Sequence, residues 1–591
     1  MSEIEEVTKE IIERNNMDEE AIRRVVSSIF DQIEKHFPFR ECAKCETFLE
    51  NTDTCPSCGH EEDKPAFREH QKEITIDAAV ALYIEGYDNV AIEGPTGIGK
   101  SAINYTLGMM SGDAFYTTPQ KSLRNQLAND EALQNGMHAL RGRRDYTCGE
   151  TGKNCSDCPV NTRNDKSCKD MPACTYWNNK MKSIGSPIAA LTFAYLIVDK
   201  YLPPMAEDGS PISFTNRDLL IVDEGHTLEN QVASLFAGFK VSPWSVPVDV
   251  YGNTGNKIKR RARRGDIKKY EQVRGEVSSV ADRARRFVEV HSDDEREETQ
   301  KKVEKCESFL QKFKYMKEEI SEGRHWVVDI EDVNHPDHNG KTKTINLKPV
   351  KVDRFLQKFV WSRSDKVILS TATMPYRQNP QEWFDRLGLE GKTKVIRKPM
   401  PFPKENRLIH TGTIIDKFSG GGDDENWNKI VDKVYELAEK HDGEKGLIHT
   451  ASYARAEKLV DSLPSGMAMV DERGVDSDEM VEKWQNSNKQ ILCSPSMTEG
   501  VDLKYDKCRW QVMLKIPYPN SHHDSRVAYM LNELKDWNWY YTTTGLEVIQ
   551  SIGRAVRAKD DEANYYVLDE SFKDIISKTN PPKWVVEALV D

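Results

Sequence analysis

Residues 94–101 of this 591-residue chain read GPTGIGKS and match the phosphate-loop pattern G-x-x-x-x-G-K-[ST]. The apolar run 89–92 before them is typical of a buried strand, and residues 102–107 can continue as a helix. Glycines let backbone N–H groups approach phosphate, and the helix N-terminus adds the positive end of its dipole. The sequence therefore predicts an ATP site, with Lys100 on the β- and γ-phosphates and Ser101 on Mg²⁺. The loop residues expected to bind nucleotide are Gly94, Thr96, Gly97, Gly99, Lys100 and Ser101.

A second nucleotide signature follows a second apolar run. Residues 219–222 read LLIV and are followed by DEGH at 223–226. An Asp-Glu pair at the end of a buried strand suits ATP hydrolysis, because one carboxylate can hold Mg²⁺ and the other can deprotonate the attacking water. We assign these roles to Asp223 and Glu224, respectively. Alone, the tetrapeptide would be an ordinary solvated strand end, but downstream of a phosphate loop it indicates an ATPase.

Four further segments occur in the order expected of a motor ATPase. They read TTPQ at 117–120, STAT at 370–373, TEGVD at 498–502 and QSIGRAVR at 550–557. Each could be an ordinary loop or helix, but their joint order favours a motor. Arg554 and Arg557 are expected to act as arginine fingers, whose effect is roughly 10³–10⁵ in rate in other nucleotide hydrolases. We add Gln550 to the catalytic set and Asp502 to the nucleotide-binding set.

Composition limits the remaining choices. The length allows roughly three to five domains. The net charge of −13 excludes a global basic field, so contacts with nucleic acid must come from local patches. The first residues are acidic and lack a secretory signal, and no apolar run approaches the ~20 residues that span a bilayer. We expect a cytoplasmic protein, nuclear if eukaryotic, without membrane contact.

Nine of the twelve cysteines fall in two clusters. The first consists of CAKC at 42–45 and CPSC at 55–58, two knuckles typical of a zinc ribbon. Four thiolates complete a tetrahedral Zn²⁺ site, so this metal is expected to be structural; the alternative is disulfides or free thiols. Its expected ligands are Cys42, Cys45, Cys55 and Cys58. The second cluster has irregular spacing, which does not choose between zinc and an iron–sulfur cluster. Its members are Cys148, Cys155, Cys158, Cys168 and Cys174.

These motifs resemble those of superfamily 2 helicases, and within them the XPD/DinG-like family of iron–sulfur DNA helicases. The resemblance rests on the Asp-Glu-x-His form of residues 223–226, on GRRDYTC at 142–148, on ACTY at 173–176 and on IPYP at 516–519. It covers roughly residues 67–570, so the N-terminal ribbon lies outside it. Gly225 replaces the usual alanine of the family's motif, a small change that should keep the backbone path.

The resemblance implies a [4Fe–4S] cluster in the insertion that carries the second cysteine group. The preferred ligands are Cys148, Cys155, Cys158 and Cys174, with Cys168 as a competitor and a second zinc site as the alternative. It also implies an α/β fold of two RecA-like parallel-sheet motor domains with inserted iron–sulfur and arch domains, preceded here by the zinc ribbon. The expected segments are 1–40 (helical), 41–62 (zinc ribbon), 63–140, 180–238 and 362–402 (motor domain 1), 141–179 (iron–sulfur domain), 239–361 (arch domain) and 403–591 (motor domain 2).

Three other segments carry weaker predictions. Gln71 resembles the adenine-reading glutamine of a Q-motif, since its amide offers both a donor and an acceptor; the alternative is a surface glutamine. A basic run at 257–269 is either a phosphate-gripping patch or a solvated face. Helical spacing of apolar residues predicts amphipathic helices in both flanking modules. The residues concerned are Ile22, Val25, Val26, Ile29 and Ile33 near the N-terminus, and Val303, Cys306, Leu310 and Phe313 in the arch.

The function that these patterns predict is an ATP-dependent DNA helicase. The resemblance implies translocation 5′→3′ on single-stranded DNA, action at duplex junctions, and a ring and wedge formed by the inserted domains. Thr118 and Ser370 are expected to contact the strand or couple it to ATP, and Tyr176 and Trp177 either stack on bases or belong to the core. We expect a monomer, with a protein partner possible through the ribbon or arch. The alternatives are an RNA-directed helicase, a damage- or redox-sensing protein with vestigial ATP use, and a nuclease.

Overall fold

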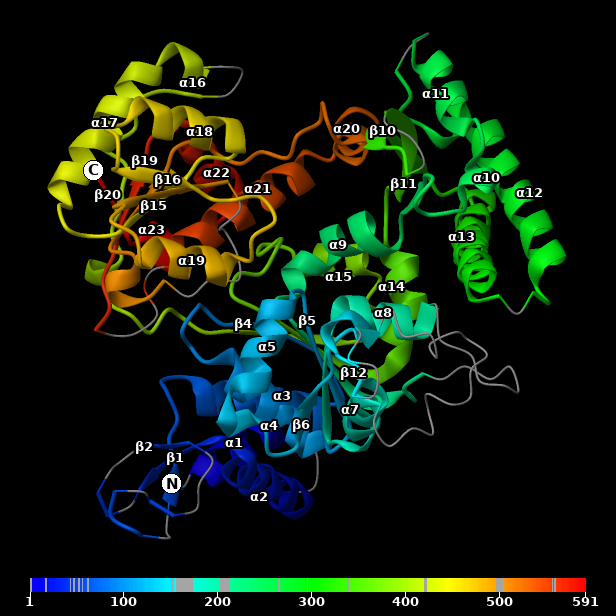
Figure 1. Cartoon of the computed structure of the whole chain (residues 1–591). Helices are drawn as coiled ribbons and strands as arrows, with labels where there is room; N and C mark the ends of the chain where they lie inside the picture. Colours follow the sequence, from blue (N-terminus) through cyan, green and yellow to red (C-terminus); the bar gives the residue numbers. More distant parts are fainter. Residues whose placement is uncertain are drawn as a thin grey trace.

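The molecule is built around two seven-stranded parallel sheets (Figure 1). A small N-terminal module precedes the first sheet, and an arm is inserted between two strands of that sheet. The computed structural model describes residues 3–15, 19–42, 44–45, 48–50, 54–55, 57–60, 63–149, 152, 154–155, 174–201, 213–263, 266–294, 296–336, 340–418, 422–495, 503–554, 556 and 560–591. Among these residues, no helix has the length and apolar character needed to cross a membrane.

The first sheet has the strand order β13-β4-β12-β8-β5-β7-β6, with every pair parallel. Its strands are β4 (Asn89–Glu93), β5 (Ala114–Thr118), β6 (Met137–Ala139), β7 (Ile188–Thr192), β8 (Arg217–Asp223), β12 (Ser364–Thr371) and β13 (Thr393–Arg397). The apolar runs at 89–93, 114–118, 188–192, 219–222 and 366–370 each predict a strand of a parallel α/β sheet from the sequence, and all five strands are confirmed. They are the apolar runs expected where helices cover both faces of a parallel sheet. The edge strands β6 and β13 were not predicted.

The second sheet has the order β16-β17-β15-β18-β19-β14-β20 and is also parallel throughout. Its strands are β14 (Ile409–His410), β15 (Gly446–His449), β16 (Ala468–Val470), β17 (Ile491–Ser494), β18 (Trp510–Met513), β19 (Asn564–Val567) and β20 (Leu589–Val590). The four longer strands match the apolar runs predicted from the sequence. The other three have only two or three residues, which is too short for a recognisable period.

Helices cover these sheets. On the first sheet they are α3 (Gln71–Tyr83), α4 (Lys100–Ser111), α5 (Lys121–Asn129), α7 (Thr175–Gly185), α8 (Phe193–Tyr201), α9 (Leu228–Gln231), α14 (Asp353–Phe359) and α15 (Pro380–Leu387). The second carries α16 (Gly422–Glu425), α17 (Trp427–Lys440), α18 (Tyr453–Ser462), α19 (Ser477–Gln485), α21 (Trp537–Ile552), α22 (Ser571–Thr579) and α23 (Lys583–Val586). Helix α20 (Ser525–Asn532) instead packs against strand β10 (Trp326–Asn334) and α21.

An arm between β8 and β12 stands away from the first sheet (Figure 1, green). It consists of β9 (Phe239–Val241), α10 (Val248–Tyr251), α11 (Thr254–Ala262), α12 (Arg274–His291), α13 (Glu297–Ser321), β10 (Trp326–Asn334) and β11 (Lys341–Pro349). The predicted amphipathic helix is confirmed as α13, which packs against α12 through buried Val303, Cys306 and Phe313. The described part of the basic run is exposed, and two of its members form ion pairs, Arg261 with Glu276 and Lys269 with Glu533.

The N-terminal module consists of α1 (Glu3–Asn15), α2 (Glu19–His36) and an antiparallel sheet of β1 (Phe39–Cys42), β2 (Phe48–Glu50) and β3 (Asp63–Pro65). Helix α2 packs against α3 and α4, which cover the first sheet. Four of the five predicted apolar positions are buried, namely Ile22, Val26, Ile29 and Ile33. The prediction for Val25 was wrong: it is 43% exposed, because one residue turns the helix by about 100° and points it away from the packed stripe.

Candidate nucleotide site and cysteine clusters

The phosphate loop, residues 94–101, connects β4 to α4. Gly97 and Gly99 have φ of 85° and 81°, a conformation that strains other residues. Helix α4 begins at Lys100, so its free N–H groups point into the loop, as anion binding requires. The Lys100 ammonium donates to the Gly94 carbonyl at 3.2 Å, which folds the side chain over the loop. The backbone therefore has the form of a phosphate cradle.

Asp223 and Glu224 meet this loop from the end of β8. The buried Asp223 carboxylate accepts from the Tyr116 hydroxyl at 3.0 Å and from the Glu224 backbone N–H at 3.0 Å. Burial, reinforced by the neighbouring Glu224 charge, raises the pKa of Asp223 to about 6. Glu224 has φ of 51°, and its Oε1 lies 3.9 Å from Lys100 Nζ. The site thus concentrates negative charge next to one lysine, which suits a divalent cation.

His226 links the two sheets. Its Nδ1 lies 2.8 Å from the Thr371 hydroxyl oxygen, and its Nε2 contacts the side-chain amide of Gln550. The Thr371 hydroxyl donates its single proton to the Thr373 carbonyl at 2.9 Å, so it must accept from Nδ1–H. Nε2 is then free of a proton and accepts from the Gln550 amide. In the sequence His226 is only part of the Asp-Glu-x-His motif, and no local pattern predicts its contact with Gln550.

The second sheet closes the site through the end of α21. Gln550 lies in its last turn, and Arg554 follows directly. The chain passes so close to the phosphate loop that a Cβ added to Gly553 would lie 2.9 Å from Thr96 Oγ1. A cavity of about 750 Å³ results, which we call the nucleotide cavity. Its lining includes Thr96, Gly97, Gly99, Lys100, Ser101, Asp223, Glu224, His226, Gln550 and Arg554.

Four aromatic side chains also line the nucleotide cavity, namely Phe67, Phe402, Tyr505 and Trp584. Phe402 lies between β13 and β14 in the chain, and Trp584 belongs to the short helix α23 near residue 591. Phe402, Tyr505 and Trp584 were not predicted from the sequence, since no phosphate-binding or catalytic pattern surrounds them. Flat apolar side chains suit a nucleobase.

Gln71 differs from its expected role. It is completely buried at the start of α3, its amide donates to the Gly99 carbonyl at 3.4 Å, and it accepts from the Arg68 backbone N–H at 2.7 Å. Both ends of the amide are thus bonded to protein in this structure, leaving no open edge for a purine. Gln71 supports the phosphate loop from behind, while Phe67, Arg68 and Glu69 line the cavity.

Two expected strand-contacting residues are also internal. Thr118 is fully buried and donates to the Gln120 carbonyl at 3.1 Å, and Ser370 is fully buried at the end of β12. Because both side chains are buried, neither reaches nucleic acid in this structure, and their expected role in coupling the strand to ATP stays a prediction. Asp502 and Arg557 lie outside the described residues.

The N-terminal cysteines form a compact group. The sulfurs of Cys42, Cys45, Cys55 and Cys58 all lie within 4.8 Å of one another. Two local turns produce this arrangement: the Gly59 N–H donates to the Cys55 carbonyl at 2.8 Å, and the Cys55 N–H donates to the His60 carbonyl at 2.8 Å. Four sulfurs at this separation fit tetrahedral coordination of one metal ion. The pairing of the two knuckles, predicted from their spacing, is confirmed as geometry.

The described cysteines of the second cluster converge through the backbone. The Thr175 hydroxyl donates to the Thr147 carbonyl at 3.0 Å, which brings the chain around Cys174 to that around Cys148. The Cys155 N–H donates to the Tyr146 carbonyl at 2.9 Å. Among the described residues, however, the sulfurs of Cys148, Cys155 and Cys174 do not form a compact group like that of the N-terminal cysteines, and Cys158 and Cys168 lie outside the described residues. Near Cys174, Tyr176 is buried and bonded to Tyr195, so it belongs to the core and cannot stack on a base.

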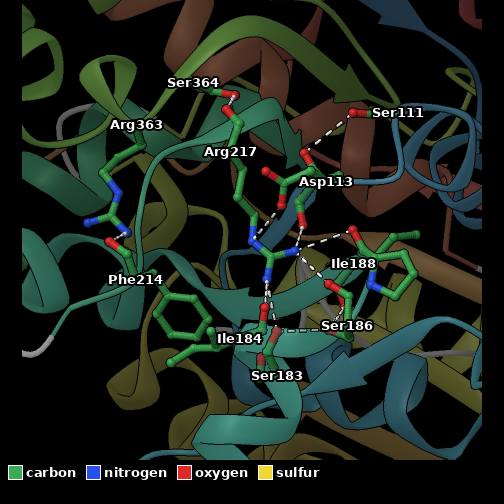
Figure 2. Close-up of polar contacts among 12 residues, drawn as sticks. Ser111, Asp113, Ser183, Ile184, Ser186, Ile188, Phe214, Arg217, Arg363 and Ser364 are labelled. Atoms are coloured by element: carbon green, nitrogen blue, oxygen red, sulfur yellow. Dashed lines mark hydrogen bonds and ion pairs between the residues drawn. The ribbon is translucent and has the colours of Figure 1, made fainter.

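Arg217 ties this insertion to the catalytic strand (Figure 2). It opens β8, the strand that ends at Asp223, and its guanidinium donates to the carbonyls of Ser183 and Ile184 at 2.9 Å each. It also donates to the carbonyl of Ser186 at 2.8 Å. These carbonyls lie at the end of α7, whose N-terminal cap is Cys174. One buried arginine thus joins the cysteine insertion to the base of the catalytic strand.

Comparisons with known proteins agree with this architecture. The helicase C-terminal domain family matches residues 434–588. The ATP-dependent DNA helicase CHL1 of Vanderwaltozyma polyspora is 27% identical over 126 residues, an alignment that spans 18% of this chain and only 15% of that protein. The solved structure named XPD Helicase has a TM-score of 0.58 at 15% identity, covering 86% of this chain and 96% of that one. S. tokodaii Xpd4 gives 0.53 at 14% identity, covering 88% and 99%.

The solved structures show the fold, and the domain match covers residues 434–588, which contain most of the second sheet. In its described fold the chain thus resembles the solved XPD helicase structures, and its residues 434–588 are similar to a helicase C-terminal domain.

Proposed function

We propose that this protein hydrolyses ATP to translocate along single-stranded DNA, moving 5′→3′ and separating duplex DNA at junctions. The observation that carries this proposal is the nucleotide cavity. Its walls bring the phosphate loop and the Asp-Glu pair of the first sheet against Gln550 and Arg554 of the second. A site shared between two sheets can convert ATP binding and hydrolysis into relative movement of the sheets.

In the proposed mechanism, the backbone of the phosphate loop and Lys100 hold the triphosphate. Ser101 and Asp223 would hold Mg²⁺, which neutralises charge on the phosphates when bound. Glu224 orients the attacking water and accepts its proton, while Arg554 and Arg557 stabilise the charge that develops on the transferred phosphoryl group. Gln550 contacts His226 and so links the second sheet to the Asp223–Glu224 pair. Asp502 contributes to nucleotide binding from the second domain.

We assign the two cysteine clusters to different groups. The closed N-terminal set fits one structural Zn²⁺, and the cysteines around Cys148 and Cys174 would hold a [4Fe–4S] cluster. We also propose that the chain divides into the helical segment, zinc ribbon, two motor domains, iron–sulfur domain and arch domain that the resemblance implies. Anaerobically purified protein should be brown, with about one zinc and about four irons per chain. Cys148→Ser should lose the iron and keep the zinc, and Cys55→Ser should do the reverse; a colourless protein with two zincs contradicts the assignment.

The decisive experiment measures ATP hydrolysis in the presence of single-stranded DNA, duplex DNA or RNA. We expect the strongest stimulation by single-stranded DNA, and unwinding of 5′-tailed rather than 3′-tailed duplexes. Lys100→Ala and Glu224→Gln serve as inactive references, because both side chains act on the nucleotide and neither belongs to an apolar core. Stimulation by RNA alone would favour the RNA-directed alternative, and wild-type turnover in either variant would contradict the proposed site.

A further inference from the structure

The strand that leaves the cysteine group leads directly into the nucleotide cavity. Strand β3 ends at Pro65, and the cavity lining begins at Phe67 and continues through Arg68 and Glu69. Only Ala66 separates the two. A displacement of β3 would therefore also move Phe67 and Arg68, the first residues of the cavity wall.

Strand β3 is held in place by the strand that carries a cysteine ligand. In the antiparallel pair β1–β3, Cys42 lies opposite Asp63, and Arg40 lies opposite Pro65. The pairing extends one residue further, since the Ala66 N–H donates to the Phe39 carbonyl at 3.0 Å. β3 is an edge strand of only three residues, so it has little other main-chain support. Its position therefore depends on β1, whose last residue is Cys42.

An aromatic contact adds a second connection. The rings of Phe37 and Phe67 lie 4.2 Å apart between centroids, and Phe37 is buried between α2 and β1. The Phe37 N–H still donates to the Ile33 carbonyl, so this ring extends from the end of α2. Phe67 is thus wedged between the N-terminal module and the nucleotide cavity that it lines.

Hydrogen bonds carry the connection on to the phosphates. The Arg68 guanidinium donates to the Gly97 carbonyl at 3.2 Å. The Arg68 backbone N–H donates to Gln71, whose amide donates to the Gly99 carbonyl. Segment 67–71 therefore supports the backs of the two glycines that shape the phosphate cradle.

We propose that metal binding to the N-terminal cysteines controls ATP affinity. With the four sulfurs joined by Zn²⁺, β1 fixes β3, and β3 fixes segment 67–71 against the phosphate loop. Without the metal, the positions of β1 and β3 are less constrained, and segment 67–71 is no longer held against the phosphate loop. This inference rests on the proposed function for the identity of the nucleotide and adds a regulator to the same site. Because such coupling is reciprocal, bound nucleotide should tighten zinc binding by the same factor.

The first experiment measures the Kd of a fluorescent, non-hydrolysable ATP analogue with Mg²⁺. We expect Cys45→Ser and Cys58→Ser to weaken binding by about 5- to 150-fold, the usual range of coupling between sites. Cys306→Ala is the matched control, since this thiol is buried in the arm, and it should keep wild-type affinity. Wild-type protein stripped of zinc should show the same loss and recover on addition of zinc, which separates coupling from misfolding.

Two further variants and one reciprocal measurement sharpen the test. Phe37→Ala should retain zinc but weaken the analogue, because it removes the ring that contacts Phe67. Arg24→Ala, at an exposed position of α2, should change neither. Competition with a zinc chelator should show tighter zinc when the analogue is present.

Equal analogue affinity with and without zinc, together with zinc affinity indifferent to the analogue, would overturn the coupling. Zinc-loaded wild-type protein that fails to bind the analogue at all would instead contradict the proposed function.

Discussion

The two parallel sheets have the same number of strands but are assembled differently. The second is formed within one continuous part of the chain, from β14 at 409 to β20 at 590. The first extends from β4 at 89 to β13 at 397 and is interrupted by the cysteine insertion and by the arm. The first sheet supplies the phosphate loop, Asp223 and Glu224, whereas the second supplies Gln550 and Arg554. The residues proposed to bind phosphate and Mg²⁺ therefore lie on the interrupted first sheet.

Buried charges brace the interrupted sheet. Asp199 in α8 binds Lys180 of α7 at 3.0 Å and Arg363, just before β12, at 3.3 Å, and all three side chains are at most 1% exposed. Lys180 follows the cysteine insertion, and Arg363 follows the arm. A buried ion pair of this kind adds little net stability, but its geometry is exacting. It therefore defines where the two returning segments join the sheet, a requirement that the continuous second sheet lacks.

The largest expected effect on ATP turnover comes from removing Arg554, the side chain that the second domain contributes to the site. Arg554→Ala should lower the turnover of ATP by about 10³–10⁵ with little change in nucleotide affinity, because an arginine finger acts on charge in the transition state. Steady-state hydrolysis and binding of a non-hydrolysable analogue check this. Lys483→Ala is the matched control, an exposed base paired with Glu472 on the same domain. A large loss of analogue affinity with unchanged turnover would assign Arg554 to ground-state binding instead.

A smaller effect concerns the free-energy cost of burying the Asp223 charge at the end of β8 in the first sheet. The pKa of Asp223 is raised to about 6, so the folded protein binds this proton more tightly than the unfolded chain. The stabilisation from that proton is complete below about pH 4 and is lost as the pH rises through 6. Asp223→Asn should therefore raise the stability by up to about 3 kcal/mol at pH 7.5, and by about half as much at pH 5.

Thermal melting of nucleotide-free protein without added Mg²⁺ checks this at both pH values. The variant should melt above wild type at both pH values, with about half the shift at pH 5, while losing ATP hydrolysis. An equal shift at both values would mean that Asp223 is ionised throughout, contrary to its burial.

The smallest effect concerns the contact between the sheets. Gln550→Ala and His226→Ala each remove one hydrogen bond across the cavity, which corresponds to about 0.5–1.5 kcal/mol, or roughly two- to tenfold in DNA-stimulated turnover. The double variant should be no worse than the more damaged single variant, because one contact cannot be lost twice. Fully additive losses would show that the two side chains act independently.

Much of the fold could be predicted from local patterns. The five central strands of the first sheet are apolar runs that end at recognisable motifs, and burial on both faces of a parallel sheet requires such runs. The short strands β6, β14, β16 and β20 have two or three residues and carry no period. Gln71 was identified as part of the site, but its burial against Gly99 depends on how α3 packs beside the phosphate loop.

The sequence by itself determined the phosphate loop, the Asp-Glu pair and the paired cysteine knuckles, because each depends on residues a few positions apart. Only the tertiary structure decided which distant residues complete them. His226 meets Gln550 across 324 positions, Arg217 reaches back to α7, and Trp584 closes the nucleotide cavity from near the end of the chain. Such contacts leave no local pattern, because they are selected by packing between elements rather than by the conformation of any one segment.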